Sequence, residues 1–186
     1  MEKRSGLWQL MGFAVTALTG TLLHFLYEWS GESAWVAPFA SVNESTWEHM
    51  KLLFWPMLIY TLVQSFFFRG SHNFICIKTR GILLGISLIP IMFYTYNGVI
   101  GKSPDFINVA IFFISASIAY LYEWQQLKTE KVSCKNPKLS AIVLCAIAAM
   151  FVIFTYRAPD LGIFKDPLTA TYGIKAAFSA ISRAFL

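Results

Sequence analysis

The chain has 186 residues, of which 56% are hydrophobic, 17% aromatic and only 13% charged. Its mean hydropathy of +0.56 is far above that of soluble domains, so the composition excludes an ordinary soluble enzyme and favours an integral membrane protein. The net charge of +5 would suit nucleic acid binding in a soluble chain, but here the basic residues lie between apolar segments. We therefore expect a lipid bilayer as the partner, and no nucleic acid.

Apolar segments follow one another along the chain at residues 7–29, 48–68, 81–101, 106–124 and 139–156. Each is close to the roughly 20 residues that an α-helix needs to cross about 30 Å of hydrocarbon. The sequence therefore predicts an all-α bundle of five transmembrane helices, with residues 1–173 forming a single domain. Residues 174–186 repeat apolar side chains at helical spacing but are too short to cross, which predicts an amphipathic or flexible tail.

Basic residues are distributed unevenly between the two sides of such a bundle. Nine of them fall on the side of the N-terminus against six on the other, where seven of the ten acidic residues lie. The positive-inside rule then places the N-terminus in the cytoplasm and the C-terminus outside, in a multi-pass protein of a bacterial-type cell membrane. Cys76 and Cys134 fall in loops of the cytoplasmic side and Cys145 in the inner half of the fifth span, so we expect no thiol to face an oxidising compartment.

The densest polar stretch, Val42-Asn43-Glu44-Ser45-Thr46-Trp47-Glu48-His49-Met50-Lys51, directly precedes the second apolar body. Ser45 and Glu48 have the spacing of a capping box, which predicts that a helix begins here. Acidic side chains near a helix N-terminus are also stabilised by its partial positive charge. This gives Glu44 and Glu48 a purely structural explanation, which competes with a functional one.

Histidines and carboxylates are predicted to meet at the outer ends of the first two helices. His24 lies about 25 Å along the first helix, at the depth of His49, and Glu28 follows one turn later. If the two helices are antiparallel neighbours, the candidates converge as a group: His24, Glu28, Glu44, Glu48 and His49. Two imidazoles with carboxylates suit zinc, manganese or iron, whereas calcium prefers oxygen ligands alone.

Several observations bear on how this group is interpreted. Histidines at a membrane interface often serve as hydrogen-bonded anchors, and Lys51 or Lys102 could neutralise the carboxylates. Asp160 and Asp166 could close over the same site. No charged residue occurs in residues 52–68, 81–100, 106–122 or 139–156, so a midplane carboxylate for ion coupling is missing. We expect any chemistry at the outer rim.

Three segments carry a resemblance: His24-Phe25-Leu26-Tyr27, the stretch at 42–51, and residues 164–174. Together they resemble a family of small bacterial multi-pass membrane proteins of unknown function, with an Asn-Glu-Ser-x-Trp-Glu-His motif that implies no assigned activity. Ser45 and His49 are also similar in spacing to the Ser-x3-His of the alkaline ceramidase superfamily of membrane zinc hydrolases. The later His-x3-His of that superfamily is missing here, where only His24-x3-Glu28 is available, and five spans replace seven.

Three functions follow from these residues, and whether the chain is an enzyme stays open. The leading hypothesis is a metal-dependent hydrolase acting on a lipid or amphiphile at the outer membrane face. In it, His24, His49 and either Glu28 or Glu44 hold zinc, manganese or iron, and the catalytic candidates are Glu48, as general base, and Ser45. The second is a non-catalytic subunit that binds or transports a small solute or cation. The third is a structural membrane protein without metal; the sequence identifies no protein partner for any of them.

Overall fold

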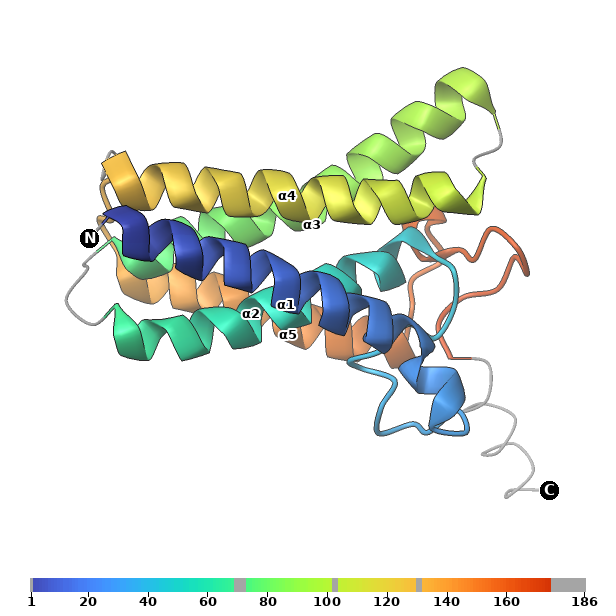
Figure 1. Ribbon diagram of the computed structural model, residues 1–186. Coiled ribbons are helices and arrows are strands. Elements are labelled where there is room, and N and C mark those ends of the chain that lie inside the picture. Colours follow the sequence, from blue (N-terminus) through green and yellow to red (C-terminus); the bar gives the residue numbers. More distant parts are fainter. Residues whose placement is uncertain (1, 69–72, 102–103, 130–131, 175–186) are drawn as a thin grey trace.

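The computed structural model describes residues 2–68, 73–101, 104–129 and 132–174 (Figure 1). Its helices are α1 (Glu2–Trp29), α2 (Thr46–Phe67), α3 (Phe74–Ile100), α4 (Asp105–Thr129), α5 (Pro137–Tyr156) and the short 3-10 helix η1 (Gly162–Phe164). The described residues contain no β-strand, only an isolated bridge between Lys165 and Tyr172. Of the tail expected at 174–186, only Ile174 is described, and it is buried; residues 175–186 lie outside the described part of the chain.

The five long helices run up and down, so that each is antiparallel to the next along the chain (Figure 1). Helix α1 packs against α2 and α4, while α3 packs against α2, α4 and α5. All five are long and apolar enough to cross a membrane, which fits a multi-pass membrane protein and confirms the predicted all-helical, five-span fold. We call the end where α1, α3 and α5 begin the amino-terminal end. The opposite end, which carries the connections at 30–45 and 157–174, is the loop end.

Small residues let α1 approach its neighbours closely. Gly12, Thr16 and Gly20 recur every four residues along one face of the helix. A Cβ at Gly12 would lie 2.5 Å from the ring of Tyr60 and 2.6 Å from that of Tyr120. Between the glycines, the Thr16 hydroxyl forms a hydrogen bond of 2.8 Å with the Tyr120 hydroxyl. This spacing is typical of transmembrane helices that pack backbone against side chain, and it seats α1 between α2 and α4.

The structure differs from the prediction at the edges of α3 and α4. Helix α3 begins at Phe74 rather than at 81, and α4 continues to Thr129 rather than ending at 124. Lys78 therefore lies inside a helix, where it forms an ion pair with Glu123, and both side chains are completely buried. A lysine next to an apolar run looks like a loop residue when its partner is unknown. The partner removes much of the cost of burying the charge, which lets the helix extend.

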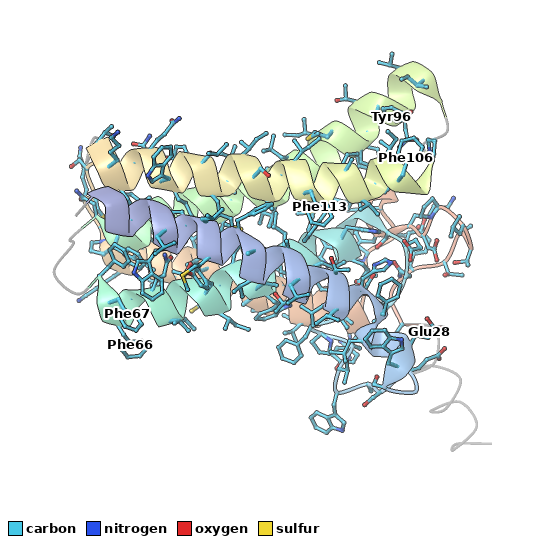
Figure 2. All side chains as sticks on the ribbon, in the orientation of Figure 1. Glu28, Phe66, Phe67, Tyr96, Phe106 and Phe113 are labelled. Atoms are coloured by element: carbon cyan, nitrogen blue, oxygen red, sulfur yellow. A yellow bond between two sulfur atoms is a disulfide. The ribbon has the colours of Figure 1, made fainter. Side chains whose placement is uncertain are left out.

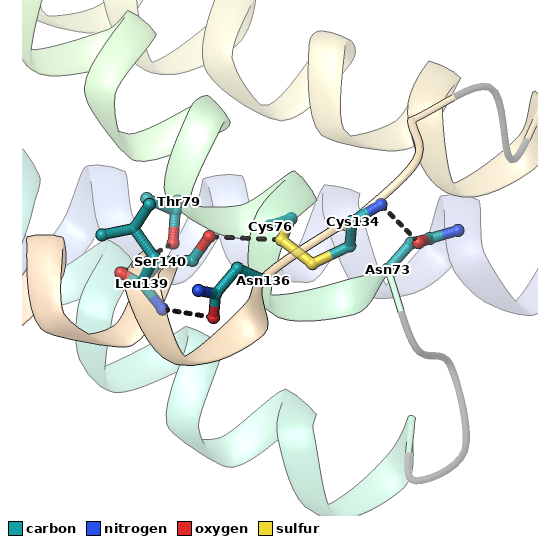
Figure 3. The surroundings of a disulfide bond; sticks show 7 residues. All are labelled: Asn73, Cys76, Thr79, Cys134, Asn136, Leu139 and Ser140. Carbon is teal, nitrogen blue, oxygen red and sulfur yellow. Dashed lines mark hydrogen bonds between the residues drawn. A yellow bond between two sulfur atoms is a disulfide. The ribbon is translucent and has the colours of Figure 1, made fainter.

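A disulfide joins Cys76 in the first turn of α3 to Cys134 in the connection before α5, with 5.8 Å between the two Cα atoms (Figure 3). The Cys134 amide donates to Asn73 Oδ1 at 2.9 Å, which anchors the connection to the start of α3. The sequence led us to expect free thiols here, whereas the structure pairs Cys76 with Cys134 and leaves Cys145 as the free cysteine. The early start of α3 is the physical reason, because it carries Cys76 to the α4–α5 connection. The cysteines no longer argue for a cytoplasmic amino-terminal end.

Candidate metal centre

The start of α2 sets the positions of Glu44 and His49. Ser45 is the N-cap, its Oγ accepting the Glu48 amide at 3.4 Å, as the capping pattern predicted. Asn43 Oδ1 accepts the Ser45 amide at 2.9 Å, which fixes the residue before the cap. Glu44 therefore lies just ahead of the helix and His49 one turn inside it. Both side chains face the same side, toward the last turns of α1.

His24, Glu44 and His49 converge between α1 and α2. Glu44 Oε1 lies 3.6 Å from His24 Nε2, and its Oε2 lies 3.5 Å from His49 Nε2. One possible ligand atom from each residue lies within 4.8 Å of the other two. The side chains are 28%, 42% and 18% exposed, in chain order, so an ion from solvent could reach them. Two imidazoles and one carboxylate match the ligand set of a catalytic zinc site that keeps an open position.

A hydrogen bond within α2 fixes which nitrogen His49 offers to this cluster. Its Nδ1 lies 2.9 Å from the carbonyl oxygen of Ser45. A carbonyl oxygen can only accept, so Nδ1 carries the proton and donates. In the neutral ring, Nε2 then has a lone pair directed at Glu44 and His24. A histidine whose second nitrogen is held in this way has the usual arrangement of a metal ligand.

A cavity of about 370 Å³ opens beside the three side chains, between α1 and α4. Its apolar lining comes from Phe25, Leu52, Val109, Phe112, Phe113 and Leu168, and its polar lining adds Thr21 and Asn108 to the cluster. Phe113 lies on the side of α4 that faces α1 (Figure 2). A lining that combines polar groups with aromatic rings suits a molecule with a polar head and an apolar chain.

The connection after α5 reaches this cavity through Leu168. Asp166 is buried and its Oδ1 accepts the Leu168 amide at 2.8 Å, while its Oδ2 accepts the Thr169 hydroxyl at 2.6 Å. Asp166 thus shapes the turn that carries Leu168. We expected Asp160 and Asp166 to close over the site with their carboxylates. Among the described residues the closing side chain is instead apolar, and neither aspartate lines the cavity.

Glu48, expected to act as a general base, is not brought to the cluster. Its side chain is 2% exposed, and its Oε2 accepts from Lys51 Nζ at 2.5 Å and from the Val42 amide at 3.0 Å. Lys51 also donates to the Ala37 carbonyl and to Thr155 Oγ1, both at 2.9 Å. This ion pair ties the 30–45 connection, α2 and α5 together. The geometry favours the structural explanation for Glu48, and its catalytic role stays a prediction without support here.

The two other candidates also have positions that limit their roles. The Ser45 hydroxyl is used by the helix cap, so the residue serves the cluster through its carbonyl oxygen. Glu28 is exposed in the last turn of α1 (Figure 2) and does not belong to the cluster. Glu28 lies one helical turn beyond His24 and is therefore too far along α1 to reach the cluster. Glu44 supplies the carboxylate instead. Of the four predicted ligands, the structure therefore assembles three.

Sequence reasoning found only His24, Glu44 and His49 of this cavity, and missed the rest of its lining, including Asn108 and Leu168. Asn108 lies in the first turn of α4, and its place beside α1 depends on which helices are neighbours. The sequence did contain a signal for Asn108, because a polar side chain inside an apolar span often marks a functional site. Leu168 had no such signal, because the turn that positions it depends on the buried Asp166.

A family model matches most of the sequence. The chain belongs to DUF6512, a family of unknown function. The match covers residues 1–174, and therefore all five DUF6512 helices, the three clustered side chains and the turn with Leu168. Neither the curated proteins nor the solved structures gave a match to the chain. The match confirms that the chain belongs to a family without an assigned activity. The chemistry of the DUF6512 site must therefore be inferred from its own residues.

Proposed function

We propose that this DUF6512 chain is a metal-dependent hydrolase that acts on a lipid or amphiphile at the outer face of a bacterial-type cell membrane. The observation that carries the proposal is the convergence of His24, Glu44 and His49 within 4.8 Å, at the mouth of an apolar cavity. Zinc is the best fit because it prefers nitrogen and carboxylate ligands and leaves a position open when three residues hold it. Manganese and iron are the alternatives.

The proposed chemistry divides between the ion and the cavity. A bound zinc would lower the pKa of a coordinated water toward neutrality and polarise a carbonyl oxygen of the substrate. Phe112 and Phe113 would hold the apolar chain, which leaves the ester or amide bond next to the cluster. Asn108 lines the same cavity and would contact the polar head. Since Glu48 is engaged by Lys51, the metal itself would supply most of the activation of water.

Elemental analysis of the purified, detergent-solubilised protein tests the metal centre. We expect near-stoichiometric zinc, manganese or iron in the wild type and none in a His24→Ala/His49→Ala double variant. His72→Ala removes the third histidine of the chain and is the matched control, expected to keep the metal. Wild-type protein without metal after chelator-free purification would overturn the proposal. A panel of ester- and amide-linked lipids then tests turnover, with the double variant as the inactive reference.

The orientation is part of this proposal. The excess of basic residues on the side of the amino-terminal end supports a cytoplasmic N-terminus and an outward-facing site. The Cys76–Cys134 disulfide at the same end supports the opposite orientation, because disulfides persist in oxidising compartments. Fusing alkaline phosphatase, which is active only outside the cytoplasm, to each terminus separates the two. We expect activity from the C-terminal fusion alone, and activity from the N-terminal fusion alone would reverse the assignment.

A non-catalytic subunit that binds or transports a cation or small solute is the second candidate. The observation that favours it is the position of Glu48, which leaves the three clustered side chains without the expected base. Reversible binding of zinc without turnover of any lipid in the panel would favour this function. A structural role without metal is the third, since Glu44 pairs with both histidines at 3.5–3.6 Å. It predicts no metal in the wild type.

A further inference from the structure

A second cavity of about 350 Å³ lies at the amino-terminal end, on the same seam between α1 and α4. Gly6, Gln9, Leu10, Phe13, Ser117, Tyr120, Leu121 and Trp124 line it. The Thr16–Tyr120 hydrogen bond lies between this cavity and the candidate metal centre. Leu10 and Leu121 at its edges are 65% and 54% exposed, so the cavity is an open groove on the lipid-facing side of the bundle. We call it the amino-terminal groove.

Polar atoms at the closed side of this groove lack partners. Gln9 is 3% exposed, and neither its amide nitrogen nor its amide oxygen makes a hydrogen bond within the described residues. The indole N–H of Trp124 is also buried and without a partner there. A buried polar group that is left without a hydrogen-bond partner costs about 1–3 kcal/mol. The groove therefore needs an occupant that brings hydrogen-bond acceptors to this depth.

A positive charge stands at the end of the groove nearest the membrane surface. Lys128 lies one helical turn beyond Trp124, is exposed, and places its Nζ 5.8 Å from the centroid of the Trp124 ring. Tryptophan and lysine in this order are typical of the level where lipid glycerol and headgroups meet. Lys128 is not itself part of the lining but contacts Trp124, which lines the groove together with Gln9 and the apolar Leu10, Phe13 and Leu121.

We propose that the amino-terminal groove is a binding site for one acidic phospholipid of the leaflet at that end. The headgroup phosphate lies against Lys128, an ester carbonyl accepts from the Trp124 indole and the Gln9 amide, and one acyl chain lies along Phe13. A phospholipid combines an anion, carbonyl acceptors and hydrocarbon, which match the cation beside the groove and the donors and apolar side chains that line it. This site does not depend on the proposed function, because it shares no lining residue with the metal centre.

Lipid retention tests the proposal. The full-length protein is reconstituted in equal parts of phosphatidylglycerol and phosphatidylcholine, extracted in mild detergent and weighed by native mass spectrometry. We expect one tightly held lipid per chain, mainly phosphatidylglycerol. Lys128→Gln removes one positive charge near the surface and should lower the preference for phosphatidylglycerol about fivefold. Lys138→Gln, at an exposed lysine at the start of α5, is the matched control and should leave the preference unchanged.

A second pair of variants tests the groove itself. Ser117 lies in the groove and its hydroxyl donates to the carbonyl of Phe113 in its own helix. Ser117→Phe should fill the groove and displace the lipid. Ser65→Phe makes the same change on α2, where the hydroxyl donates to Leu62 in the same way, and should retain the lipid. Size-exclusion profiles establish that both variants fold, and the surface variant Lys128→Gln remains informative if one of them does not.

Three outcomes would overturn the proposal. One is equal retention of phosphatidylglycerol and phosphatidylcholine by the wild type, which would mean that the groove does not select an acidic headgroup. Another is equal lipid loss in Ser117→Phe and Ser65→Phe, which would place the retained lipid elsewhere. The third is a shift from monomer to dimer that Ser117→Phe abolishes, which would make a second copy of the chain the occupant.

Discussion

His49 Nδ1 lies 2.9 Å from the carbonyl oxygen of Ser45, so the residue that caps α2 also orients the imidazole one turn later. The bond directs His49 Nε2 at Glu44, whose other oxygen faces His24. The helix start and the candidate metal centre are therefore built by the same backbone turn. A site preorganised in this way would bind a metal without the entropic cost of ordering a loop.

The two glutamates at the loop end should differ sharply in their effect on metal binding. Glu44 contacts both histidines, whereas Glu28 is exposed and lies outside the cluster. Replacing residues that only support metal ligands costs about 10- to 100-fold in affinity, so Glu44→Gln should weaken zinc binding at least tenfold. Glu28→Gln should leave it unchanged. Competition with a zinc-sensitive dye in detergent measures both, and equal affinities in the two variants would remove Glu44 from the ligand set.

Glu48→Gln should destabilise the protein far more than the loss of a helix cap would. The change leaves the completely buried Lys51 charge without its carboxylate. Breaking a buried pair from one side costs about 3–5 kcal/mol, compared with about 1 kcal/mol for a cap. Denaturant titration in detergent, followed by circular dichroism, measures the free energy of unfolding.

A second substitution, at the ion-pair partner Lys51, provides the control for the unfolding measurement. A Glu48→Gln/Lys51→Met double variant removes both charges and should recover much of the stability that Glu48→Gln loses. Glu32→Gln, at an exposed position with no pairing role in the described structure, should behave as wild type. A cost of only about 1 kcal/mol in Glu48→Gln would contradict the ion pair.

Alanine at two glycines should change stability in opposite directions. A Cβ at Gly12 would lie 2.5 Å from the Tyr60 ring, so Gly12→Ala must displace an aromatic side chain between helices. Overpacking of this kind typically costs about 1–3 kcal/mol. A Cβ at Gly98 in α3 meets no atom within 4 Å, so Gly98→Ala should raise helix stability by about 0.5 kcal/mol. Thermal unfolding of the two variants beside the wild type measures both changes in stability. A Gly12→Ala variant as stable as the wild type would mean that α1 packs more loosely than the structure shows.

Thiol counting tests the disulfide. Denatured protein without reductant should take up maleimide at Cys145 alone, and reduced protein should take it up at all three cysteines. A Cys145→Ser variant should then give no adduct before reduction and two after it. Intact-mass measurement reads each number directly. Three adducts on unreduced protein would show that Cys76 and Cys134 are thiols, as the sequence suggested.

Most of the fold followed from hydropathy, because each span is a mainly apolar run of the required length. The meeting of His24 and His49 followed from depth along two antiparallel helices, with no knowledge of side-chain packing. The choice between Glu28 and Glu44 could not be made this way. That choice depends on the path of the 30–45 connection, which is held in place where its Ala37 carbonyl accepts from Lys51 of α2.

Long-range pairs account for what the sequence could not provide. Lys78 lies at the edge of an apolar run, and only the contact with Glu123, 45 residues away, explains its place inside a buried helix. Cys76 and Cys134 are separated by 58 residues, without any short motif to suggest that they pair. Helical periodicity and capping describe neighbours within about one turn. They do not identify which helices share a face.

Lys51 also has a consequence for the order in which the chain is assembled during synthesis. Its partners Glu48 and Ala37 precede it by 3 and 14 residues, so both have been synthesised before α2 enters the membrane. The third partner, Thr155 at the end of α5, is synthesised last of all. The hydrogen bonding of the Lys51 ammonium group is therefore complete only after the final helix has been synthesised. Ribosome-bound chains that stop before α5 should remain susceptible to protease at the loop end, and the full chain should not.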